Sequence, residues 1–123
     1  MKKHIIQMTK EEVKILRDRI RKSINMRRPI TLTKHCKDRM NEKNIAMYDM
    51  IMVLKDYDLI EYHLKDSDER VLLRGKKDYD GKNICISYSV KEKRIITTYV
   101  NKLDDNHNTL DLNNYNEKIL IGV

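Results

Sequence analysis

The sequence predicts a single α+β domain in which helices pack on a four-stranded antiparallel meander. A chain of 123 residues is long enough for one domain with one modest hydrophobic core. The first half shows amphipathic helical patterns, and the second half holds four strand-like runs. Short polar segments separate these runs. Because parallel strands need long crossover connections that the chain lacks, the runs predict antiparallel neighbours.

The first predicted element is a basic amphipathic helix over residues 9–26, within a segment 1–29 that ends at Pro29. Thr9 and Glu12 have the spacing of a capping box at its start. Apolar residues recur every three or four positions at Val13, Leu16, Ile20 and Ile24. The remaining surface carries Lys14, Arg17, Arg21 and Arg28. The apolar stripe could pack on the sheet of its own chain or form a homodimer through residues 9–26.

Two shorter helices are expected over residues 34–42 and 47–56. Thr33 can cap the first of them, which places His35 in its first turn. His35, Asp38 and Arg39 share one helical face, whereas Cys36 suits the core. The face has two interpretations: a functional pair of His35 and Arg39, or an ordinary surface turn in which Arg39 pairs with Asp38.

The four strands are predicted at residues 58–64, 70–76, 83–90 and 94–101, and they complete a core domain over residues 30–102. In "RVLLRG", Arg70 and Arg74 fall on one side of the strand, so both can point away from the core. Residues 103–123 form a polar tail that could add an edge strand.

Charge and composition narrow the classes of function. The net charge is +7, and residues 1–43 alone hold 14 Lys and Arg against 5 Asp and Glu. This asymmetry can attract a nucleic acid or an acidic protein as partner, although it is also common on a helix that is merely solvated. Two cysteines and the lack of a signal-like apolar segment favour the cytoplasm, and no apolar run approaches the roughly 20 residues that cross a bilayer. The scattered histidines and isolated glycines predict neither a metal site nor a cofactor.

The order of motifs over residues 30–102 resembles domain-of-unknown-function family 4258 of bacteria and phages. The run "LTKHCKDRM", the helix after Ile45 and the final run "IITTYVN" carry the resemblance. Family positions fall on Thr33, His35, Arg39, Met40, Ile45 and the run Ile96 to Tyr99. This chain departs from the pattern at Cys36, Ala46 and Thr98. The layout is also similar, more distantly, to the RelE and BrnT toxins, small basic proteins that cut RNA.

The toxin resemblance implies metal-independent RNA cleavage, which needs a base, a phosphate ligand and an acid. The residues expected in the catalytic site are His35, Arg39, Arg74 and Tyr99. The residues expected to bind nucleic acid are Arg70, Arg17, Arg21, Arg28 and Lys34. We expect His35 and Arg39 to border a cationic groove whose other wall carries Arg70 or Arg74. The alternative is a non-catalytic binding protein of a phage or mobile element, for example an inhibitor of a host defence complex.

Overall fold

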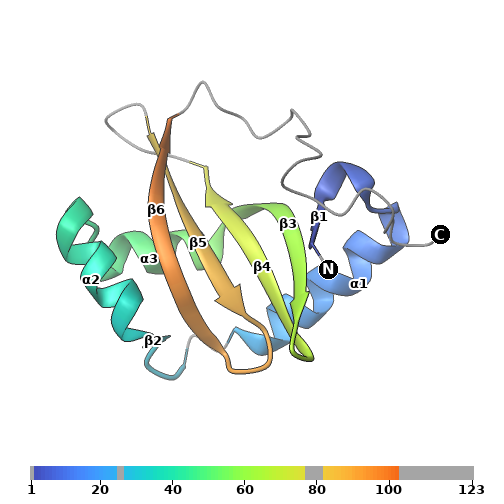
Figure 1. Cartoon of the computed structure of the whole chain (residues 1–123), viewed down its shortest axis with the longest axis horizontal. Coiled ribbons are helices and arrows are strands. Elements are labelled where there is room, and N and C mark those ends of the chain that lie inside the picture. The colour runs from blue at the N-terminus through green and yellow to red at the C-terminus, as the bar shows by residue number, and fades with distance from the viewer. Residues whose placement is uncertain (1, 25–26, 77–81, 103–123) are drawn as a thin grey trace.

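The computed structural model describes residues 2–24, 27–76 and 82–102, and it is an α+β domain (Figure 1). Three α-helices lie on one face of a single sheet, whose other face is open in this part of the chain (Figure 1). The α+β class predicted from the sequence is confirmed.

The sheet differs from the predicted meander because it has six strands among the described residues and is mixed. The four expected strands are present as β3 (Tyr57–Lys65), β4 (Asp68–Gly75), β5 (Lys82–Ser89) and β6 (Arg94–Lys102), each antiparallel to the next. Strand β1 (Lys2–His4) adds antiparallel to β3, and β2 (Thr31–Leu32) adds parallel to β6. These two edge strands have three and two residues, too few to show an alternating pattern in the sequence.

The helices are α1 (Lys10–Ser23), α2 (Lys34–Lys43) and α3 (Met47–Lys55), with a short 3₁₀ turn, η1 (Ile5–Gln7), before α1. Thr9 caps α1 in the predicted capping box with Glu12, and Thr33 caps α2. The α1 helix ends before the predicted residue 26. Its last side chain, Ser23, contacts the Tyr88 hydroxyl at 3.0 Å and donates a hydrogen bond to the Val90 carbonyl at 2.7 Å. The next residue, Ile24, is extended, so contact with the sheet stops the helix.

One hydrophobic core lies between the helices and the sheet. Leu16 and Ile20 of α1 belong to the same buried cluster as Met50 of α3 and Leu73 of β4, so the apolar stripe packs on its own chain. Cys36 is fully buried, as predicted for a core residue. Gly75 allows a close approach, because a Cβ there would lie 2.9 Å from Val53 Cγ2.

Two further sequence-based expectations concern the tail and the length of the apolar segments. The polar tail 103–123, predicted as a candidate edge strand, lies outside the described residues. None of the helices in the described ranges is long and apolar enough to cross a membrane.

Candidate functional site

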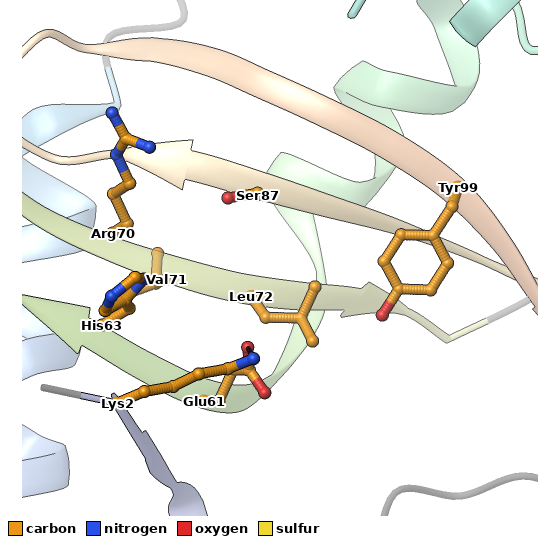
Figure 2. Close-up of a pocket in the computed structure, with 8 residues that line it drawn as sticks. All are labelled: Lys2, Glu61, His63, Arg70, Val71, Leu72, Ser87 and Tyr99. Atoms are coloured by element: carbon orange, nitrogen blue, oxygen red, sulfur yellow. Dashed lines mark ion pairs between the residues drawn. The ribbon is translucent and has the colours of Figure 1, made fainter. Parts of the chain in front are cut away.

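The open face of the sheet contains a hollow of about 350 Å³ (Figure 2). We call it the open-face hollow and define it by its lining residues, Lys2, Glu61, His63, Arg70, Val71, Leu72, Ser87 and Tyr99. These residues come from β1, β3, β4, β5 and β6, so the hollow crosses most of the sheet. In Figure 2, His63 lies beside the base of the Arg70 side chain, and the Tyr99 ring extends from β6 toward Leu72.

A tight hairpin places His63 beside Arg70. Asp66 and Ser67 both have positive φ, of 50° and 65°, as a two-residue turn between paired strands requires. The turn sets the register in which His63 pairs with Arg70, and the two side chains therefore emerge on the same face. The same alternation sends Tyr62 and Val71 to the helix face, where both are buried.

A register shift in β3 brings a carboxylate to the same place. The pairing with β4 shifts between Leu59 and Glu61, with Ile60 as the extra residue of a bulge. Glu61 then pairs with Leu72 on the open face. Glu61 Oε1 forms an ion pair with Lys2 Nζ at 3.3 Å, and this contact places Lys2 of β1 at the hollow.

Burial and neighbouring cations tune the titratable groups. Partial burial lowers the pKa of His63, and the positive charges of Lys2, Lys65 and Arg70 lower it further. The imidazole is thereby favoured in its neutral form near pH 7 and can accept a proton. Arg70 is held in place by an Nε–Asp68 Oδ2 ion pair of 3.2 Å, and buried Ser89 donates to both oxygens of the same carboxylate.

The predicted site residues are divided among different places. Arg70 and Tyr99 line the open-face hollow. Arg74 is on the same side of β4, but it is paired with Asp58 at 3.5 Å and does not line the hollow.

The residues predicted on α2 lie elsewhere. This helix contacts β6, two strands away from β4, at the edge of the sheet (Figure 1). His35 and Lys34 are exposed, and Arg39 pairs with Glu42 at 3.3 Å rather than with Asp38. No α2 residue lines the hollow, so its walls are formed by strands and not by the expected pair of α2 and β4.

The remaining predicted cations lie on the helix side of the molecule. Arg17 and Arg21 line a second groove, between α1 and the end of α3. Arg28 borders a smaller cavity near Pro29.

Sequence reasoning missed Lys2, Glu61, His63 and Ser87. A signal for two of them was present, because Glu61 and His63 alternate with Tyr62 in "IEYHL" and so share the polar side of a strand. The short turn "KDSD" could have indicated that His63 and Arg70 lie opposite each other on paired strands. Lys2 had no comparable signal, since the three-residue β1 shows no strand pattern.

The described residues contain no group of three or more His, Cys, Asp or Glu side chains arranged to hold a metal ion. The side chains that line the open-face hollow include an imidazole, a guanidinium, a carboxylate and a phenol, from His63, Arg70, Glu61 and Tyr99.

The comparison with protein families matches residues 32–100, more than half of the chain, to the family described as Domain of unknown function (DUF4258). The chain belongs to this family. No curated protein and no solved structure matches it. The DUF4258 region runs from β2 into β6 and includes His63, Arg70 and Tyr99, whereas Lys2 and α1 lie outside it.

Proposed function

We propose that this chain is a metal-independent endoribonuclease whose catalytic site is the open-face hollow. The observation that carries the proposal is the convergence of His63, Arg70 and Tyr99 in one hollow, with His63 favoured as a neutral base. The predicted resemblance to the RelE and BrnT toxins supports the same class of reaction. The basic charge of the chain supports a polyanionic substrate.

In the proposed reaction, neutral His63 takes the proton of a ribose 2′-hydroxyl, and the 2′-oxygen forms a bond to phosphorus. The bond from phosphorus to the 5′-oxygen breaks, and the Tyr99 hydroxyl supplies the proton that the leaving oxygen needs. Arg70 and Lys2 stabilise the negative charge that builds up on the phosphoryl oxygens. The products are a 2′,3′-cyclic phosphate and a 5′-hydroxyl end; His63 then releases its proton to solvent, and Tyr99 regains its proton from solvent.

The test incubates the full chain with a defined single-stranded RNA in the presence of EDTA and identifies the product ends. We expect cyclic phosphate ends, and no cut where the 2′-hydroxyl is replaced by hydrogen. His63→Ala should lower the cleavage rate at least about 100-fold, which is the range for a lost general base, while RNA binding stays within a few-fold.

The exposed histidine of α2 provides the matched control. His35→Ala removes the same side chain at the β6 edge, and it should leave the rate within about twofold if the hollow is the site. Loss of cleavage in His35→Ala but not in His63→Ala would move the site to α2 and to the His35 and Arg39 pair. A wild-type chain that cuts no RNA would contradict the enzyme proposal.

A second candidate function is non-catalytic binding, including the inhibition of another protein complex. Its support is the groove lined by Arg17 and Arg21, which lies apart from the open-face hollow. The cleavage assay separates the two functions, because a binding protein would leave the RNA intact in every variant.

A further inference from the structure

The groove on the helix side of the molecule has a chemical character of its own. It has a volume of about 730 Å³ and lies between α1 and the segment that joins α3 to β3. We call it the α1–α3 groove and define it by its lining residues, Lys10, Val13, Lys14, Arg17, Asp18, Arg21, Ile24, Leu54, Lys55, Asp56, Tyr57 and Lys76. It shares none of these residues with the open-face hollow.

The rim of the α1–α3 groove holds an excess of positive charge. Six of its residues are Lys or Arg and two are Asp. Both acids are already paired, Asp18 with Arg21 at 2.6 Å and Asp56 with Lys76 at 3.2 Å. Four cations are left without an ion pair within the described residues: Lys10, Lys14, Arg17 and Lys55. Three of them follow one another on α1 at spacings of four and three residues, so they form one row along the helix.

The floor of the groove is aliphatic. Val13 of α1 and Ile24, the residue after α1, are partly exposed there, and Leu54 of α3 lines the groove with them. Tyr57 is the one aromatic lining residue among those described, and its burial raises the pKa of its hydroxyl. A single-stranded nucleic acid gains most from flat aromatic faces on which its bases stack. An aliphatic floor instead matches the apolar side chains of a peptide.

An exposed apolar strip on α3 also favours a protein partner. Tyr48 is 68% exposed and Met52 is 44% exposed. Together with Lys55 they are spaced by four and three residues and share one side of α3. Tyr and Met are enriched at the centres of protein interfaces. Lys55 also lines the α1–α3 groove, so the strip meets the groove at this residue and adds an apolar surface suited to a protein.

From these observations we infer that the α1–α3 groove binds an acidic amphipathic segment of a partner protein. The apolar side chains of the segment lie on Val13, Ile24 and Leu54, and its carboxylates pair with the free cations of the rim. This interaction does not require the chain to cleave RNA, and its residues are separate from His63 and Arg70.

The test measures binding to a fluorescently labelled peptide that has leucines along one helical face and glutamates along the other. The full chain should bind it, with an affinity that falls as salt rises because the rim contacts are ionic. A peptide of the same composition in scrambled order should bind at least about fivefold more weakly. Replacing its glutamates by glutamine should weaken binding at least about tenfold.

Paired variants locate the binding surface. Lys14→Glu and Lys55→Glu reverse one exposed charge on each wall, and each should weaken peptide binding at least about fivefold. Lys37→Glu is the matched control, because it makes the same change on an exposed position of α2, and it should stay within about twofold. Met52→Ser tests the apolar strip and should weaken binding without changing the net charge.

Three outcomes would overturn the inference. Equal affinity for the ordered and scrambled peptides would mean that charge alone attracts the peptide. Equal loss in Lys14→Glu and Lys37→Glu would mean that no particular groove is involved. Absence of peptide binding, combined with RNA binding that Lys14→Glu weakens, would assign the groove to nucleic acid instead. The result of the RNA cleavage assay on His63 does not change the interpretation of any of these three outcomes.

Discussion

The two faces of the sheet are built from the same strands, yet they hold different kinds of side chain. On β4, the side chains of Val71 and Leu73 face the helices and are almost fully buried, whereas those of Arg70 and Leu72, which alternate with them, line the open-face hollow. On β3, buried Tyr62 stands between Glu61 and His63. The comparison teaches that stability is concentrated on the helix face, because burial of apolar groups is the largest favourable contribution to folding. Substitutions on the open face should accordingly change chemistry more than they change stability.

The largest expected contrast comes from two neighbouring leucines of β4. Leu73→Ala should lower the free energy of unfolding by about 2–5 kcal/mol, since it leaves a cavity in the core. Leu72→Ala, on the half-buried open face, should cost less than about 1 kcal/mol. Urea unfolding of both variants measures the difference. Equal losses would show that the open face is packed against something as tightly as the core is.

A second contrast concerns the loss of stability at alkaline pH. The buried Tyr62 hydroxyl donates to Glu69 at 3.1 Å, and its pKa is raised to about 12 by burial and by the Glu69 carboxylate, with Arg19 opposing. In the unfolded chain a tyrosine titrates near 10, so the folded state binds more protons between these values. Stability should therefore be lost as the pH rises from about 10 to about 12, by roughly 2–3 kcal/mol for this residue.

Urea unfolding at about pH 9 and about pH 11.5 measures the loss, with Tyr62→Phe as the control. The variant should lose less stability than the wild type over the same interval. A drop of the same size in both proteins would assign it to other groups, such as Tyr57 and Tyr88, whose pKa values are also raised by burial.

A smaller contrast compares two serines. Ser23→Ala removes the buried contacts of α1 with Tyr88 and Val90 and should cost about 1–2 kcal/mol. Ser87→Ala changes a lining residue of the open-face hollow and should cost less than about 0.5 kcal/mol. Thermal unfolding of the two variants makes the comparison. A larger loss for Ser87→Ala would place a stabilising network on the open face.

The smallest effect on stability, and a clear one on activity, is expected from His63. Because its pKa is lowered below 6.5, the unfolded chain binds more protons than the folded chain just below that pH. Stability should therefore decrease as the pH falls through 6.5 toward the lowered pKa. His63→Gln should remove this part of the pH dependence in thermal unfolding. If His63 is the base of the proposed ribonuclease, the cleavage rate should fall over the same acidic range, and a rate that rises there would contradict its role.

Much of the fold could be predicted because the signals are local. The capping residues Thr9 and Thr33 and the spacing of apolar residues located the three helices, and alternation located the four long strands. The prediction was wrong about the size of the sheet, since β1 and β2 are held by pairing with residues distant in the chain. It also extended α1 past Ser23, whose contacts with Tyr88 and Val90 join positions more than 60 residues apart.

The candidate site was predictable only in part. Arg70 and Tyr99 were chosen from the sequence as residues on polar strand faces, and both line the hollow. His35 was chosen over His63 because it lies in a helical motif. That motif does not determine which strand of the sheet the helix packs against. His35 and Arg39 remain predictions, at the β6 edge of the molecule.

By itself, the sequence determined the α+β class, the order of the three helices and the four long strands, the burial of Cys36 and the basic surface of α1. Periodicity, capping and charge act over a few residues, so they can be read without knowing the fold. Only the tertiary structure decided that His63 faces Arg70, that Glu61 reaches Lys2, and that Arg17 and Lys55 border one groove. Those neighbours depend on a hairpin register, a bulge at Ile60 and the packing of α1 beside α3, each of which is selected by contacts between distant parts of the chain.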